Sequence, residues 1–282
     1  MSKLLLRTGL AAIVLFVFVF LSSASTKSRL AFPENTGNTY SSKIEGDWKA
    51  RIEDGKIKFQ LEYEHRNSNG HSNISLEVDK NDISDLRYDK EITFQLKREC
   101  GTMFFTGKFS GSKGKGEFEF SINENFVKYL EDKGFYDIKE ENYIIFFTCD
   151  INKDFINGLS KLGYNKLTSS QLTSFAIFRV TPDFIKDIQS AGYSDISAQK
   201  LVDFRIFKVT PEYIKEISRT GVKNIKPQNL IDFKIFNVTG KFIDKVKNIT
   251  KKKELTAGYI VNAKIVGVKL ADNDDNEDDE DN

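Results

Sequence analysis

Histidine, cysteine and proline are scarce in this sequence of 282 residues, and each shortage excludes a class of protein. The two histidines, His65 and His71, are too few for most catalytic centres built on imidazole. The two cysteines exclude a small scaffold held by several disulfides and a zinc site of four thiolates. Neither a G-x-S-x-G nor an H-E-x-x-H motif occurs. We therefore predict no catalytic residue, no cofactor and no enzymatic activity.

The composition is that of a folded protein, with 39% apolar, 29% charged and 12% aromatic residues. The net charge of +1 hides an uneven distribution along the chain. Residues 25–122 balance sixteen basic against sixteen acidic side chains, whereas residues 210–270 hold thirteen basic and five acidic ones. Residues 271–282 carry eight carboxylates and no cation. We expect these last twelve residues to be an acidic, disordered tail.

The amino-terminal segment has the three parts of a signal peptide, predicted over residues 1–24. Lys3 and Arg7 precede the apolar run 9–21, and small residues follow at Ser22-Ser23-Ala24. Thirteen apolar residues are fewer than the roughly 20 needed to cross a bilayer. We expect export to the periplasm or the extracellular space, with membrane contact only if this segment stays uncleaved. Residues 25–42 are polar and are interpreted as a linker.

Apolar residues alternate with polar ones through residues 43–122, which predicts an antiparallel β domain. Asp54-Gly55 and Asn69-Gly70 are typical hairpin turns between alternating segments. The glycine- and lysine-rich stretch 111–116 is interpreted as a flexible hairpin tip and not as a phosphate-binding loop, because it opens no helix. We expect about six strands, arranged as a curled meander or a small sandwich.

A repeat of 29 residues occupies residues 123–270. Aromatic residues recur at this interval, as do glycines, leucines and valines: Phe126, Phe155, Phe184, Tyr213 and Phe242; Gly134, Gly163, Gly192 and Gly221; Leu172, Leu201 and Leu230; Val180, Val209 and Val238. Thr181-Pro182 and Thr210-Pro211 are typical helix starts, and Gly192 stands where a left-handed helix stop is expected.

Each unit is predicted to form two short helices, of which the second carries apolar residues on more than one side, such as Leu201, Phe204 and Ile206. We expect this second helix to lie between neighbouring units, because one helix pair cannot bury its own faces. The fold class is therefore predicted as α+β: a β domain followed by a solenoid of about five αα-hairpin units. Thr148 and Cys149 make the first unit atypical.

The motifs Trp48-Lys49-Ala50-Arg51, Lys97 to Gly107 and the repeated Val-Thr-Pro units resemble an exported bacterial region. It is the β-plus-helical-repeat segment that follows the membrane domain of antirepressor-type, β-lactam-sensor-like zinc metallopeptidases. The resemblance covers about residues 43–270 and implies an accessory region that binds a ligand or partner. The peptidase motif is absent, so the resemblance implies no catalytic residue here.

Three further features are candidate sites. A disulfide between Cys100 and Cys149 would join the sheet to the first helical unit; the alternative for Cys149 is a small core residue, because its column elsewhere holds Phe178, Phe207 and Phe236. His65 and His71 could bind a metal with Glu62 or Glu64, but a polar loop is the favoured interpretation.

The third candidate is a cationic surface for an anionic partner, which the acidic tail would shield: Lys241, Lys245, Lys247, Lys251, Lys252 and Lys253. The alternative is that these lysines only solubilise the last unit. We predict a non-enzymatic binding or scaffold module for a protein or envelope partner, and no nucleic-acid binding. The alternatives are a sensor accessory to a membrane peptidase, and a hydrolase with a site at the sheet–solenoid junction.

Overall fold

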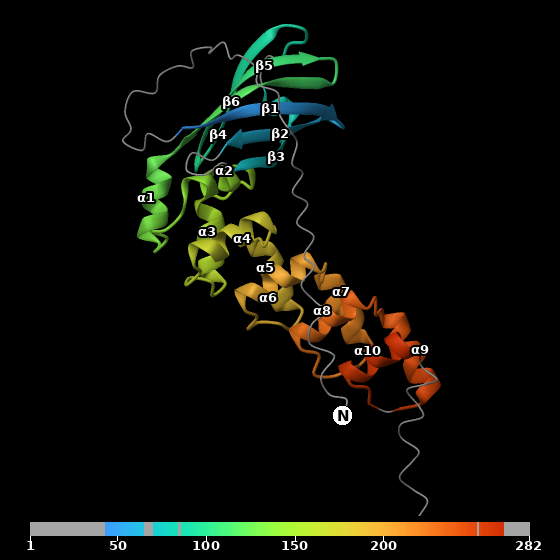
Figure 1. Ribbon diagram of the computed structural model, residues 1–282. Coiled ribbons are helices and arrows are strands. Elements are labelled where there is room, and N and C mark those ends of the chain that lie inside the picture. Colours follow the sequence, from blue (N-terminus) through green and yellow to red (C-terminus); the bar gives the residue numbers. More distant parts are fainter. Residues whose placement is uncertain (1–42, 65–69, 84–85, 253, 268–282) are drawn as a thin grey trace, which may run out of the picture. The chain divides into compact units, whose positions relative to one another are not determined.

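The computed structural model describes residues 43–64, 70–83, 86–252 and 254–267, and shows an α+β fold (Figure 1). The predicted signal peptide, linker and acidic tail lie outside these residues. The amino-terminal part contains the strands β1 (Lys43–Glu53), β2 (Lys56–Glu64), β3 (His71–Asp79), β4 (Glu91–Arg98), β5 (Gly101–Ser110) and β6 (Lys113–Ile122), and the short 3₁₀ helix η1 (Lys80–Asp82). The α-helices that follow are α1 (Glu124–Asp132), α2 (Glu140–Thr148), α3 (Lys153–Lys161), α4 (Ser169–Ile177), α5 (Pro182–Ser190), α6 (Ala198–Ile206), α7 (Pro211–Arg219), α8 (Pro227–Ile235), α9 (Gly240–Thr250) and α10 (Ala257–Val266).

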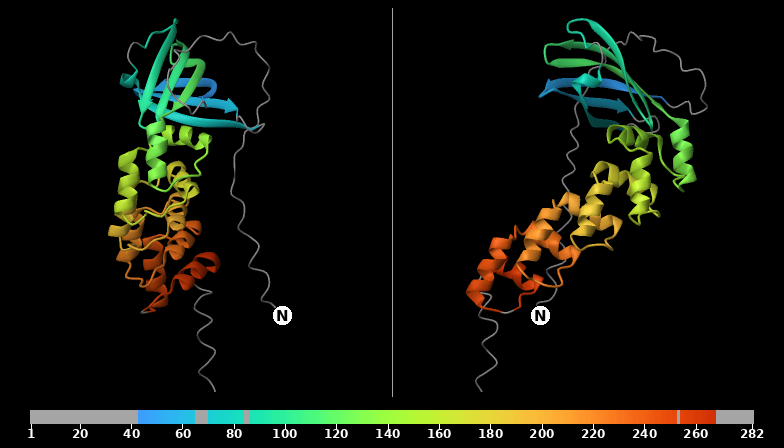
Figure 2. Two further views of the ribbon diagram at one scale, coloured as in Figure 1. Left: turned by 90° about the vertical axis from the view of Figure 1, so that its left-hand side faces the viewer. Right: turned by 180° about the vertical axis from the view of Figure 1, so that it is seen from behind.

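The six strands form one antiparallel sheet in the order β3-β2-β1-β6-β5-β4 (Figure 2). The number of strands is as predicted, but the topology differs from both expectations. It is not a plain meander, because β1 pairs with β6 while β3 and β4 are the two edges. It is not a sandwich, because the six strands belong to a single sheet. Strand pairing between the two ends of the domain is a long-range choice that local alternation does not specify.

The hairpin turns agree with the sequence in one place and differ in another. Asp54 and Gly55 have φ values of 51° and 73°, the left-handed conformation that a tight hairpin requires. The stretch 111–116, however, is not a loop. The turn consists of Gly111 and Ser112, and β6 begins at Lys113, so residues 113–116 pair with both β1 and β5.

Trp48 is the centre of the sheet's core and is 1% exposed. Its indole N–H donates to the carbonyl oxygens of Thr106 and Glu117 at 3.2 and 3.1 Å. Its ring packs edge-on against Phe59 at 5.4 Å and Phe105 at 6.2 Å. The buried residues of the alternating segments surround it, which confirms the predicted apolar face: Ile57, Leu61, Leu76, Met103, Phe109, Phe118 and Phe120.

The helices repeat the same start and stop signals every 29 residues. The N-caps of α1, α3, α5, α7 and α9 are Asn123, Asn152, Thr181, Thr210 and Thr239. In the last four, the side-chain oxygen accepts from the backbone N–H three residues on, which satisfies a donor that the helix leaves free. The left-handed stops after the first four are glycines, as predicted: Gly134, Gly163, Gly192 and Gly221.

Helices of the same kind contact one another along the chain. The even-numbered helices make the successive contacts α2–α4, α4–α6, α6–α8 and α8–α10, and α3 contacts α5 as α7 contacts α9. Two tyrosines make the same tie one unit apart: Tyr164 Oη donates to the Ile196 carbonyl at 2.6 Å, and Tyr193 Oη to the Ile225 carbonyl at 2.7 Å. Neighbouring units therefore meet in an equivalent way.

The sheet and the first helices are joined at the turn between β4 and β5. The Arg98 guanidinium donates to the Phe147 carbonyl of α2 and lies 5.2 Å from the Phe147 ring centroid. The neighbouring Glu99 carboxylate accepts from the Lys153 backbone N–H at 2.7 Å, at the start of α3. Phe120 of β6 also packs on the Phe147 ring at 5.2 Å. One turn of the sheet thus contacts two helices.

Candidate protein-binding surface

The even-numbered helices from α4 onward end in a pair of apolar residues that the fold leaves accessible. Ile177 and Ile206 are 51% and 43% exposed, and Ile265 and Val266 are exposed as well. The pairs recur every 29 residues, with one extra residue before the last. We call this set the apolar ridge: Ile177-Phe178, Ile206-Phe207, Ile235-Phe236 and Ile265-Val266.

The exposure of the apolar ridge corrects the expectation for the second helix of each unit. Leu201 and Phe204 are fully buried, as expected, but Ile206 is not. The column of Cys149 is likewise no core column, because Phe178 and Phe236 are more than one-third exposed. The helical period places these last residues past the contact with the neighbouring helix, so nothing in the described chain covers them fully.

The chain direction reverses just after each apolar pair, in a residue with positive φ. These residues are Arg179, Lys208 and Asn237, with φ values of 57°, 56° and 53°. No glycine occupies the position, although a left-handed conformation costs other residues free energy. Arg179 and Lys208 are exposed, so cations lie directly beside the apolar pairs of α4 and α6.

Hydrogen bonds hold neighbouring helix ends side by side. Arg205 of α6 donates from Nε to the Phe178 carbonyl at the end of α4, at 3.0 Å. Its guanidinium also lies 4.8 Å from the Phe184 ring centroid. The equivalent pairs in the next two units are Lys234 on Tyr213 at 4.0 Å and Lys264 on Phe242 at 4.6 Å. The apolar ridge is therefore bordered by a row of cations stacked on aromatic rings.

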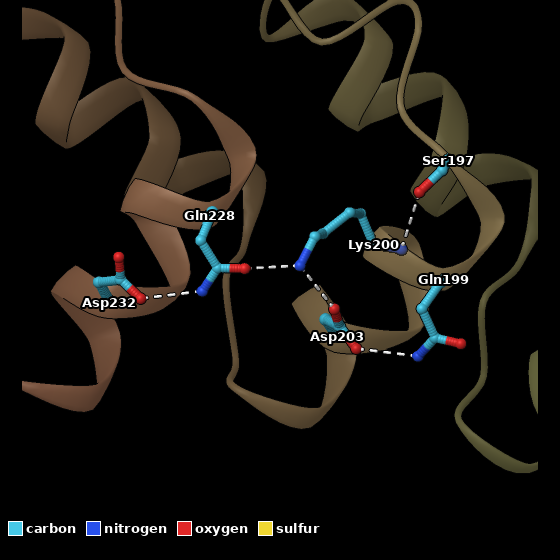
Figure 3. Close-up of polar contacts among 6 residues, drawn as sticks. All are labelled: Ser197, Gln199, Lys200, Asp203, Gln228 and Asp232. Atoms are coloured by element: carbon cyan, nitrogen blue, oxygen red, sulfur yellow. Dashed lines mark hydrogen bonds and ion pairs between the residues drawn. The ribbon is translucent and has the colours of Figure 1, made fainter. Parts of the chain in front are cut away.

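At their other ends, α6 and α8 are joined by polar side chains (Figure 3). The Lys200 ammonium donates to Asp203 at 3.0 Å and to the Gln228 side-chain oxygen of α8 at 2.6 Å. Gln228 in turn donates to Asp232 at 2.8 Å, as Gln199 does to Asp203 at 3.0 Å. Both carboxylates are thus engaged within the helices, and the accessible charge beside the ridge is positive.

The predicted cationic surface is only partly available for a ligand. Lys241 and Lys245 of α9, and Lys251 after it, are exposed. Lys247 instead donates to the Thr220 carbonyl at the end of α7, and the Lys252 ammonium lies 4.5 Å from the Tyr259 ring centroid. Lys253 lies outside the described residues. Two of the six lysines therefore serve the contact between elements.

Cys100 and Cys149 are free thiols in the structure. Cys100 is fully buried, and burial raises its pKa to about 12. Cys149 is half-buried, and burial raises the pKa of its thiol too, against the nearby charge of Arg179. A thiol is a poor nucleophile when its pKa lies above the ambient pH, so neither group is suited to nucleophilic catalysis at neutral pH.

The histidine region shows one contact and no metal cluster within the described ranges. The Nε2 atom of His71 lies 3.2 Å from the Glu64 carboxylate, and both side chains are exposed. His65 lies outside the part of the chain that the structure describes. Among the residues it does describe, no group of three or more potential ligands is close enough to hold a metal ion. None of their helices is long and apolar enough to cross a membrane.

No family model matches this chain, and neither a curated protein nor a solved structure matches it. The assignment of the apolar ridge therefore depends on this chain's geometry alone. Its signal was present in the repeat: Ile177, Ile206 and Ile235 form a column at the last turn of a helix. We assigned that column to the core because apolar repetition by itself does not tell a buried column from an exposed one.

Proposed function

We propose that the helical units form a solenoid that binds a protein partner through the apolar ridge. The observation that carries this proposal is the exposed apolar pair at the end of each of four successive even-numbered helices. Contiguous exposed apolar surface is a common mark of a protein interaction site. A single exposed isoleucine would need no explanation, but a column of them on helices that contact one another is a continuous surface.

The first unit supports this interpretation. Its equivalent residues are Thr148 and Cys149, of which Thr148 is buried and Cys149 half-buried. Here the Arg98 side chain of the sheet lies over α2. The apolar pair is thus missing where another part of the chain covers the helix end, and present where nothing does.

The charges beside the ridge indicate the chemistry of the partner. Arg179, Arg205 and Lys208 are exposed cations near the pairs of α4 and α6, whereas Asp203 is held by Lys200 and Gln199. A complementary segment would carry apolar side chains for the ridge and carboxylates for these cations. We therefore propose an acidic, apolar segment of an exported or envelope protein as the partner. A co-operating membrane peptidase is one candidate, on the resemblance alone.

The test is a comparison of two variants with matched exposure. Ile177→Ser with Ile206→Ser removes the centre of the ridge, and Ile249→Ser removes a side chain of α9 that is 45% exposed but lies outside it. The full-length chain, carrying a photo-crosslinking residue at position 236, is exposed to envelope extract and the crosslinked protein is identified. We expect the double variant to lose that crosslink and the control to retain it. Equal crosslinking by both variants would contradict the proposal. So would a ridge-dependent homodimer in sedimentation, which would make the ridge a self-association surface.

A further inference from the structure

The polar face of the sheet carries a basic cavity that charge counting does not reveal. A cavity of about 880 Å³ lies over β1, β2, β5 and β6 at the end near the Asp54 and Gly111 turns. Six cationic side chains and one carboxylate, that of Glu53, line it: Lys49, Arg51, Lys58, Lys108, Lys113 and Lys115. Residues 43–122 as a whole hold fourteen basic and fifteen acidic side chains. The cavity is therefore a segregated excess of positive charge in a nearly neutral domain.

Strand register brings these cations face to face. Lys115 of β6 lies directly opposite Lys49 of β1 on one side and Lys108 of β5 on the other. One step along, Arg51 lies opposite both Lys113 and Lys58. Like charges in such cross-strand pairs destabilise a sheet. Four repulsive pairs in adjacent rows are a cost that the fold carries without any structural return.

The single carboxylate offsets only part of this charge. Glu53 accepts from Lys58 at 3.0 Å and from Arg51 at 3.3 Å, and these hydrogen bonds hold the pKa of the Glu53 carboxyl below its usual value. Lys49 bonds to Glu62 at 3.0 Å, outside the cavity. The remaining three cations, Lys108, Lys113 and Lys115, make no ion pair with any residue that the structure describes.

The surroundings of the cavity limit the size and chemistry of what it can bind. The next row along the same face is acidic, with Asp47 opposite both Glu117 and Glu62. A long polyanion or a flat anionic membrane would meet this acidic row after the basic one. No aromatic side chain lines the cavity, so it offers no platform on which bases could stack. Its volume is that of a small-molecule site.

We propose that this cavity binds a compact polyanion that carries several phosphate groups. Such a ligand would place one charged group over the row Lys49, Lys115 and Lys108, and another over Arg51 and Lys113. The two rows are about 7 Å apart, which is two residues along a strand. This site is separate from the apolar ridge and does not depend on the proposed partner.

Isothermal titration of the full-length chain with inorganic tripolyphosphate at low salt tests the proposal. We expect binding that weakens steeply as salt is added, and a rise in Tm on adding the ligand. Lys108→Gln combined with Lys113→Gln and Lys115→Gln should weaken binding at least tenfold. The matched control neutralises three exposed lysines of the helices, Lys128, Lys161 and Lys186, and so has the same net charge. It should bind as the unaltered chain does.

Three results would overturn the proposal. One is the absence of tripolyphosphate binding by the unaltered chain. Another is an equal loss in both triple variants, because net charge alone would then explain it. The third is tighter, lysine-dependent binding of an oligonucleotide or of anionic vesicles, which would replace the compact ligand with an extended one. Because the first variant removes only repulsive pairs, its Tm without ligand should be unchanged or higher, so misfolding cannot account for the loss.

Discussion

Glycine allows Trp48 to occupy the centre of the sheet. A Cβ atom on Gly107 or Gly114 would lie 2.7 or 2.8 Å from the indole ring, and one on Gly116 would lie 2.0 Å from the Thr106 carbonyl oxygen. These strand glycines therefore exist for close approach and not for turns. This explains why the glycine-rich stretch 111–116 is mostly strand: Gly114 and Gly116 provide room for a neighbour, and only Gly111 has positive φ.

Gly116→Ala should lower the free energy of unfolding by about 3 kcal/mol, because the added methyl group displaces β5 or β6. Gly258→Ala in α10 is the control, since nothing lies within 4 Å of the added Cβ and alanine favours a helix. Urea unfolding followed by Trp48 fluorescence measures both. A loss below about 0.5 kcal/mol in the first variant would show that the strands do not pack as closely as described.

At the scale of the elements, the helix pairs are joined by repeated polar ties as well as apolar packing. Tyr164 and Tyr193 use the same position, just after the glycine stop, to donate to a carbonyl of the next unit. Gln189 and Lys247 share another position and donate to carbonyls at the ends of α3 and α7. These ties satisfy carbonyl groups that short helices leave free.

Tyr193→Phe should destabilise the protein by about 1 kcal/mol, because the Ile225 carbonyl loses its donor while the ring still packs. The control is Tyr136→Phe, since Tyr136 is 78% exposed. Thermal unfolding of the two variants under identical conditions gives the comparison. If both variants match the unaltered chain, the tyrosine ties contribute nothing to the contact between units.

For the whole molecule, the turn Arg98-Glu99-Cys100 connects the sheet to the helices. Arg98 contacts the end of α2, Glu99 the start of α3, and Cys100 is buried at the same place. The Cys100 thiol therefore reports on the opening of this contact. Its reactivity also bears on the predicted disulfide with Cys149, which would make the thiol unavailable even in the unfolded chain.

Arg98→Ala should speed alkylation of Cys100 in the native protein about tenfold or more, because a charged hydrogen bond of about 2 kcal/mol is lost. Since the Arg98 charge favours the thiolate, its removal raises the pKa of Cys100 further, and faster labelling can come only from opening. Peptide mapping after timed labelling at pH 8 measures the rate, with Arg87→Ala as an exposed control. Labelling of the unfolded, unreduced chain should then reach both cysteines. An unchanged rate in the Arg98 variant, or a protected pair in the unfolded chain, would contradict this account of the junction.

The sequence by itself determined the local structure of this protein. Alternation identified the strands around Trp48, the interval of 29 residues identified the helix pairs, and Thr181 and Gly192 marked the start and stop of a helix. These features depend on neighbours within one turn or hairpin, so they are legible residue by residue. Only the tertiary structure decided that β1 pairs with β6, that Ile206 is exposed and that Lys49, Lys108 and Lys115 form one row. Each of these depends on which distant segment, if any, lies against a given face, and contact between distant segments is a property of the whole fold.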